Sequence, residues 1–331
     1  MRLLRSILFF FFIVLFGVAG FAYWWANAPL ALRSTPVEFR ILPGNGLRAI
    51  AGQVLDAGIE VEPTLLIALG RLLGAERSIK AGSYAVTPGI TPLGLMRKLT
   101  SGDVSQAEIK LLEGWTFRQW RERLDAHPDL THETRGMGES EILRRLGIEA
   151  PRLEGLLFPD TYLFDKHSSD LEVLARAHRA AKRRLESEWN QRASGLPYRS
   201  PYEALIMASI VEKETGREAD RPLVAAVFIN RLKTGMLLQT DPTVIYGMGE
   251  RFDGNLRKRD LQADTPYNTY LRPGLPPTPI AMPGVASLRA ALHPAPSNAV
   301  YFVARGDGSS HFSSTLEEHN RAVNRYQRGI Q

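Results

Sequence analysis

The strongest hydrophobic signal in the chain is an unbroken apolar run near its start, from Ile7 to Trp25. The run carries no charge, and a helix rising about 1.5 Å per residue would take it across a hydrocarbon core of about 30 Å. We therefore predict a transmembrane anchor within residues 1–28. A cleaved signal peptide is the alternative, because Ala26-Asn27-Ala28 resembles a cleavage site. The run is longer than a signal-peptide core of about 7–15 residues, which favours the anchor.

The charges around this run predict its orientation. Arg2 and Arg5 precede it, whereas the next positive residue after it is Arg33. Because positive residues tend to stay on the cytoplasmic side, we expect the N-terminus in the cytoplasm and everything after residue 28 outside. Residues 29–36 are then predicted to form a short tether.

Three segments beyond the tether share one pattern, in which an apolar strand end is followed by a glycine turn, a capping residue and an amphipathic helix. They lie at residues 41–55, 86–99 and 112–124. Thr91 before Pro92 predicts an N-cap with proline in the first helical turn. Thr116 with Gln119 predicts a capping box.

Small repeated units of this kind resemble LysM-type carbohydrate-binding modules of the cell wall, and the resemblance covers residues 37–110. It implies a glycan-binding region there. A plainer interpretation stays open, since any small α+β unit needs a turn glycine and a capped helix.

The second part of the chain alternates between helical periods and loop-like stretches. Leu223, Val224, Val227 and Phe228, for example, follow a helical spacing of three and four. We expect helices at 170–190, 201–215, 220–233 and 316–326, a strand at 299–304, and a loop-like segment at 239–283. The predicted fold class is therefore α+β, with an N-terminal transmembrane helix, the small LysM-like region, and a second α+β domain at 111–331.

Composition narrows the possible chemistry. The 331 residues include no cysteine, which excludes disulfides and thiolate metal sites. The net charge is +6, but the basic residues are scattered, so we expect no nucleic-acid partner. Nucleotide-binding and serine-hydrolase motifs are missing from the sequence. The seven histidines lack ligand spacing, so we expect no metal and no cofactor.

Acid–base chemistry remains, and its best candidates are Glu212 and Glu214 at the end of an apolar helix. On a helix, Glu214 lines up with the apolar residues that precede it, whereas Glu212 lies on a more polar stripe. Apolar surroundings and a helix C-terminus both raise a carboxyl pKa, as a general acid requires. Gly216 is expected to end the helix. Simple pairing of Glu214 with Arg217 or another cation at the helix end is the alternative, and spacing alone leaves Glu212 possible as the acid.

Longer motifs point to a known family. Residues 209–215 resemble the signature of the endolytic murein transglycosylases, the YceG-like family. Further matches occur at residues 228–247, 267–270, 274–280, 283–284, 291–294, 301–303 and 311–312. The resemblance runs from the anchor to the C-terminus. We assign no role to His293 and His311, which lie in two of these motifs.

The resemblance implies a lytic transglycosylase that cleaves the β-1,4 bond between N-acetylmuramic acid and N-acetylglucosamine without water. The muramyl C6 hydroxyl attacks its own anomeric carbon and leaves a 1,6-anhydro end. One acid–base group suffices for this reaction, and the family's catalytic glutamate falls on Glu214, with Glu212 as a supporting charge. Residues 111–331 would then form a catalytic domain with a glycan cleft.

The resemblance also implies a place of action. The chain would be a single-pass protein of the bacterial inner membrane with a periplasmic catalytic domain. There it would cut nascent peptidoglycan strands and so terminate their elongation. The implied partners are glycan strands and, as a family-level expectation, peptidoglycan synthases.

Side chains suited to holding a sugar gather after Glu214, because amides and hydroxyls can bind polar groups of the sugar while aromatic faces cover its C–H surfaces. The candidate substrate-binding residues are Gln239, Thr240, Asp241, Tyr246, Tyr267, Asn268, Thr269 and Tyr270. Glu154 and Asp160 are candidate supporting residues in a segment that resembles another cleft wall. A hydrogen-bonded loop is the alternative for the first set, and a structural turn at Pro159 for the second.

Two other functions stay open. A muramidase would use water and a second acid, for which Asp241 is the candidate, although aspartate before proline commonly caps a turn or a helix. A non-catalytic wall-binding scaffold in the membrane would make Glu214 dispensable.

Overall fold

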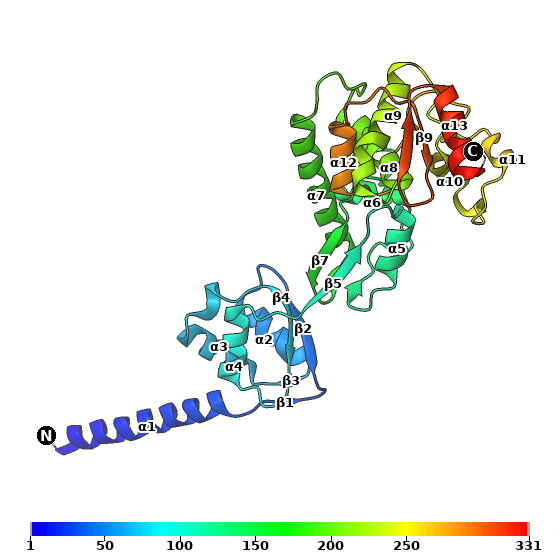
Figure 1. The fold of residues 1–331 in the computed structure, drawn as a ribbon. Coiled ribbons are helices and arrows are strands. Elements are labelled where there is room, and N and C mark those ends of the chain that lie inside the picture. Colours follow the sequence, from blue (N-terminus) through cyan, green and yellow to red (C-terminus); the bar gives the residue numbers. More distant parts are fainter. Residues whose placement is uncertain (1, 330–331) are drawn as a thin grey trace. The chain divides into compact units, whose positions relative to one another are not determined.

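The fold is mixed α+β, as predicted, and divides into two compact units. The structure, a computed structural model, describes residues 2–329. The first unit contains residues up to 108 together with 129–131 and 163–168, and the second contains the remainder. Figure 1 shows both units along the coloured chain. The hydrophobic pattern of the sequence did not predict that residues 129–131 and 163–168 belong to the first unit.

Helix α1 (Arg2–Asn27) is the predicted apolar helix. Its part Arg5–Asn27 is the one helix within the described chain that is long and apolar enough to cross a membrane. Residues 5–24 are exposed, whereas Trp25 packs against the core of the first unit and Ala26 is buried. The helix therefore has an apolar surface along most of its length and a junction with the folded chain at its end.

The first unit is built on an antiparallel pair of strands, β2 (Val37–Ile41) and β4 (Gly82–Val86). Alternate residues of β2 face the core, where Phe39 stacks on Tyr84 with ring centroids 5.8 Å apart. Three helices complete this core, as Figure 1 shows, and they are α2 (Leu47–Asp56), α3 (Pro63–Leu72) and α4 (Pro92–Ser101). The short strands β1 (Ala31–Leu32) and β3 (Ile59–Glu60) pair beside it, and a 3-10 turn, η1 (Ala75–Arg77), follows α3.

The three predicted strand–turn–helix segments are confirmed, with the predicted caps. Thr91 Oγ1 accepts a hydrogen bond from the Gly94 amide at 3.0 Å at the start of α4. Thr116 and Gln119 form the capping box of α5 (Phe117–Asp125). The strand before α5 is β5 (Gln106–Leu111), which pairs with β7 (Asp160–Asp165).

Four helices form the centre of the second unit, and Figure 1 shows them grouped together. They are α7 (Asp170–Asn190), α8 (Pro201–Glu214), α9 (Arg221–Lys233) and α12 (Val285–Leu292). Helix α8 is buried continuously from Ala204 to Val211, as expected for a helix that is apolar on all sides. It contacts the other three, so its position is set by the core.

Shorter elements surround this centre. Strands β9 (Tyr301–Ala304) and β10 (Ser310–Ser313) form an antiparallel pair, which contacts the closing helix α13 (Leu316–Gln327). The other elements are β6 (Leu130–Thr131), α6 (Glu139–Leu146), β8 (Ser168–Ser169), η2 (Glu218–Asp220), α10 (Asp241–Met248), η3 (Gly249–Arg251) and α11 (Lys258–Leu261).

Two local predictions are wrong. The segment 239–283 is not loop throughout, because it contains α10 and α11; α10 starts at Thr240-Asp241-Pro242, where proline fits the first turn of a helix. Gly216 does not end α8 in the left-handed conformation. Thr215 ends it instead, with extended backbone at φ −145°.

The close packing of Gly155 against a rigid proline ring in the second unit predicts a strong effect of Gly155→Ala. Gly155 has φ +79°, and a Cβ there would lie 2.5 Å from two atoms of the rigid Pro279 ring. Strain of the left-handed backbone and the clash should together cost about 2–5 kcal/mol of unfolding free energy. Gly195→Ala is the matched control, because Gly195 has φ +70° and open space, so only the backbone cost of about 1–2 kcal/mol is expected. Denaturant unfolding of the full chain measures both, and equal losses would contradict the close approach.

Candidate active site

The candidate acid, Glu214, stands in the last turn of α8. Ser200 caps the start of this helix, with its Oγ accepting from the Glu203 amide, and proline follows at the first position. The buried middle of the helix then carries the chain to Glu214, which is half-buried. Because the middle of α8 is packed in the core, the backbone position of Glu214 at its end is fixed.

Glu214 lies against the start of a second helix. Thr240, the residue before α10, donates a hydrogen bond from its hydroxyl to Glu214 Oε1. Burial raises the pKa of Glu214 to about 7, the nearby charge of Asp241 raises it as well, and the Thr240 hydrogen bond and Arg231 lower it. A carboxyl that retains its proton near neutral pH is suited to general acid catalysis.

A buried arginine supports this arrangement, and sequence reasoning missed it. Arg231 on α9 donates to the Val300 carbonyl at 2.7 Å and to the Leu238 carbonyl at 2.9 Å. It also approaches Gln239 Oε1 at 3.4 Å. Its charge lowers the pKa of Glu214. Arg231 lies in the family motif at residues 228–247, which was the available signal in the sequence. It was missed because charged residues on helices are usually exposed.

The segment before α10 has an unusual backbone. Gln239 is exposed and has φ +50°, a left-handed conformation that is uncommon for residues other than glycine. The backbone N–H of Gln239 donates a hydrogen bond to the Thr269 carbonyl at 3.0 Å. Strained backbone of this type is often found at functional sites, and here it lies next to Thr240, the partner of Glu214.

Asp241 and Tyr270 form the exposed side of the same region. The Tyr270 hydroxyl donates to Asp241 Oδ1 at 2.5 Å. Asp241 is the first residue of α10 and is exposed, while Thr240 occupies the N-cap position. Thr240, Asp241 and Tyr270 thus lie around Glu214, and Gln239 directly precedes Thr240.

Two other candidates lie in the interior instead. Asn268 is fully buried, donates to the carbonyls of Leu261 and Ala263, and accepts from the Tyr270 amide. Thr269 is also buried, and its hydroxyl accepts from the Thr240 amide at 3.1 Å. Both residues hold the loop that carries Tyr270 and brace the start of α10.

Glu212 has a different environment from Glu214. Its Oε2 accepts from the Gly284 amide at 3.0 Å, and its Oε1 lies 3.7 Å from Arg221. One turn earlier, Ser209 Oγ accepts from the Ile280 amide at 3.0 Å. These two side chains of α8 therefore fasten the segment 280–284 along the helix.

Glu154 belongs to a second group of buried polar residues. Its oxygens accept from the Phe117 amide and from the Tyr246 hydroxyl, each at 3.0 Å. The rings of Tyr246 and Tyr267 meet edge to face at 4.8 Å, and Tyr267 bonds to Thr278. Tyr246 lies on α10, so this group supports the helix whose other end contacts Glu214.

Asp160 and a further acidic group lie apart from these clusters. Asp160 is exposed at the start of β7, and its carboxylate accepts a local hydrogen bond from the Thr161 backbone amide at 2.8 Å. Ligand atoms of Asp125, His132 and Asp170 lie within 4.8 Å of one another. Asp170 accepts hydrogen bonds from Thr134, and Asp125 lies near Arg135, so both carboxylates have protein partners.

Fold and site together define an α+β protein with an apolar N-terminal helix and, at the end of α8, a half-buried carboxyl with a raised pKa. Residues 39–325 match the YceG-like family, and the chain belongs to that family. The resemblance recognised from the sequence motifs is thereby confirmed.

Individual relatives agree with this assignment. A Bacillus subtilis (strain 168) protein named endolytic murein transglycosylase is 34% identical over 312 residues, covering 88% of this chain and 85% of that protein. A protein of the same name from Streptococcus pneumoniae (strain D39) is 27% identical over 320 residues, covering 87% of this chain but 58% of its own length. A crystal structure of a YceG-like protein from Listeria monocytogenes superposes with TM-score 0.55 at 30% identity, covering 86% of this chain and 98% of that one.

Two substitutions beside Glu214 should move its pKa in opposite directions. Thr240→Val removes a hydrogen bond that favours the carboxylate, so the pKa should rise, whereas Asp241→Asn removes a like charge, so it should fall. If protonated Glu214 is the active form, kcat/KM drops about tenfold per pH unit above this pKa. The pH at which the drop begins should therefore rise in Thr240→Val and fall in Asp241→Asn. Shifts of the same sign, or none, would contradict the assignment.

The buried carboxyl of Glu154 should make stability depend on pH. Burial raises its pKa to about 7, above the value of about 4.3 in an unfolded chain. The folded state then binds more protons between these values, so stability falls as pH rises through this window, by at most about 1.4 kcal/mol per pH unit.

Glu154→Gln should reduce this slope, because the amide has no proton to lose. Unfolding of the full chain at pH 5, 6 and 7 measures it. Glu203→Gln in the first turn of α8 is the control, because burial raises the pKa of Glu203 but the hydrogen bonds and charge of Arg199 lower it further. An unchanged slope in Glu154→Gln would show that Glu154 is already ionised in the folded chain.

Proposed function

We propose that this chain cleaves the β-1,4 bond between N-acetylmuramic acid and N-acetylglucosamine and leaves a 1,6-anhydro end, with Glu214 as its acid–base group. Its family and named relatives make it a peptidoglycan lytic transglycosylase. The observation that carries the specific reaction is the half-buried Glu214 carboxyl, because burial raises its pKa to about 7 and a fraction of it is therefore protonated near neutral pH.

The reaction needs one group that gives and then takes a proton. Protonated Glu214 donates to the bridging oxygen of the leaving N-acetylglucosamine, and the bond from this oxygen to muramyl C1 breaks. The resulting carboxylate accepts the proton of the muramyl C6 hydroxyl as O6 bonds to C1. Glu214 is protonated again at the end of the reaction, as it was at the start. The reaction therefore consumes no water and needs no second carboxylate.

The residues around Glu214 supply different contributions in this proposal. Gln239, Asp241 and Tyr270 border the acid and would bind sugar hydroxyl and acetamido groups. Thr240 tunes the pKa of the acid directly. Tyr246 and Tyr267, with Glu154, support α10 from the other side. Glu212, Asn268 and Thr269 would act through the loops they hold, because their hydrogen bonds are made within the protein.

The apolar helix α1 supports a place of action beside the membrane. Arg2 and Arg5 favour a cytoplasmic N-terminus, which would put residues after 28 in the periplasm of the inner membrane. Residues 29–36 would be a tether, 37–110 a LysM-like glycan-binding region and 111–331 the catalytic domain with a glycan cleft. An anchored enzyme would reach newly made strands, terminate their elongation, and work beside a peptidoglycan synthase.

Product analysis tests this reaction. Purified full chain in detergent should release peptidoglycan fragments ending in 1,6-anhydro-N-acetylmuramic acid, identified by mass spectrometry. Glu214→Gln should lower the rate at least about 10²–10⁴-fold, because the amide donates no proton. Glu203→Gln, in the first turn of the same helix, should leave the rate unchanged.

The alternatives give different products. Reducing N-acetylmuramic acid ends would indicate a muramidase, with water as nucleophile and Asp241 as the second acid. Full cleavage by Glu214→Gln with loss in Glu212→Gln would show that the wrong acid is assigned. Absence of any cleavage would favour a wall-binding scaffold.

A further inference from the structure

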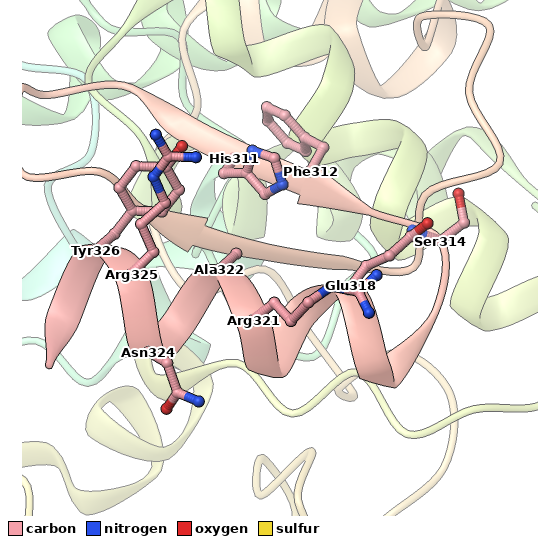
Figure 2. Close-up of a pocket in the computed structure, with 9 residues that line it drawn as sticks. All are labelled: His311, Phe312, Ser314, Glu318, Arg321, Ala322, Asn324, Arg325 and Tyr326. Atoms are coloured by element: carbon pink, nitrogen blue, oxygen red, sulfur yellow. The ribbon is translucent and has the colours of Figure 1, made fainter. Parts of the chain in front are cut away.

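A groove separate from the Glu214 site runs along α13, and Figure 2 shows the residues that line it. Its volume is about 1030 Å³. His311 and Phe312 come from β10, while Arg325 and Tyr326 come from the last turns of α13. The His311 motif, to which the sequence assigned no role, therefore faces a space large enough for a short peptide.

One end of this groove concentrates positive charge around a single aromatic ring. The guanidinium groups of Arg305 and Arg325 lie 5.7 and 5.5 Å from the centre of the Tyr326 ring. The His311 ring lies 5.6 Å from it, and Arg305 Nη2 approaches His311 Nδ1 at 3.3 Å. Two arginines and a histidine thus surround one tyrosine ring.

These arginines lack the counter-ions that their neighbours have. Arg321, on the same helix, pairs with Glu317 at 2.5 Å. Nearby Asp307 is engaged by Ser309, and Glu318 caps α13 by accepting from the amides of Ser314 and Thr315. Within residues 5–329, neither Arg305 nor Arg325 makes an ion pair with a carboxylate. Guanidinium groups without a protein carboxylate are suited to bind an anion from outside.

We propose that this groove binds a free carboxylate of the peptide stem carried by a peptidoglycan strand. The proposal rests on the proposed function, because peptidoglycan glycan bears short peptides with free carboxylates. Arg305 and Arg325 would hold the carboxylate, while Phe312 and the Tyr326 ring would contact apolar parts of the peptide. The groove then distinguishes peptide-bearing strands from bare glycan.

Contacts connect the groove with the acid–base site. His319, on α13, stacks on Tyr301 of β9 with ring centroids 5.1 Å apart. The guanidinium of Arg231 lies 5.3 Å from the Tyr301 ring, and Arg231 influences the charge of Glu214. His319 on α13, Tyr301 and Arg231 thus form a set of contacting side chains between this helix and the surroundings of Glu214 in the second unit.

Binding to an inactive full chain tests the groove independently of cleavage. Full-length Glu214→Gln protein in detergent is titrated with a soluble disaccharide-peptide from peptidoglycan, and with the same compound after its peptide carboxylates are converted to amides. We expect the probe with free carboxylates to bind about tenfold more tightly than the amidated probe, because it makes about one more charge-assisted hydrogen bond. Adding Arg305→Gln and Arg325→Gln should abolish this preference. Adding Arg321→Gln is the control and should preserve it, because Arg321 already has Glu317.

The titration has clear contrary outcomes. Equal affinity of the two probes for the Glu214→Gln protein would overturn the proposal. So would a double arginine variant that keeps the preference. A third contrary result is perturbation of Tyr326 NMR signals by inorganic phosphate but not by the carboxylate probe, which would indicate a phosphate site. None of these results bears on the 1,6-anhydro product, so failure of the groove and failure of the proposed reaction are distinguishable.

Discussion

The site depends on one carboxyl held where two helices meet end to end. Glu214 closes α8, and Thr240 opens α10 and donates to it. The C-terminus of α8 disfavours a negative charge and the N-terminus of α10 favours one, but burial has the largest effect and keeps the pKa near 7. Because α8 is buried from Ala204 to Val211, the core decides where this carboxyl stands.

The polar residues around Glu214 fall into two groups: some hold loops in place, and others are exposed beside the carboxyl. Ser209 and Glu212 fasten the segment 280–284 to α8, and Asn268 and Thr269 hold the loop that leads to Tyr270. Their burial without hydrogen bonds would be costly, so each is paired inside the protein. The exposed residues Gln239 and Asp241 are left at the surface beside the acid.

Patterns that depend on near neighbours could be predicted from the sequence. The apolar run of α1, the Thr91 cap and the Thr116 capping box involve residues within one helix, and the helical line of Glu214 follows from spacing alone. Features that depend on distant partners could not. The burial of Asn268 depends on carbonyls at Leu261 and Ala263, the role of Arg231 depends on Val300, and α10 is too short and too weakly patterned to stand out.

Direct titration of Glu214 tests the central claim most closely. Carbon-13 NMR of the full chain with labelled glutamate side chains, assigned by comparison with Glu214→Gln, follows this carboxyl from pH 4 to pH 9. A midpoint at about 7 is the predicted result. A midpoint near the ordinary glutamate value of about 4.3 would mean that Glu214 carries no proton at neutral pH and would contradict its role as the acid.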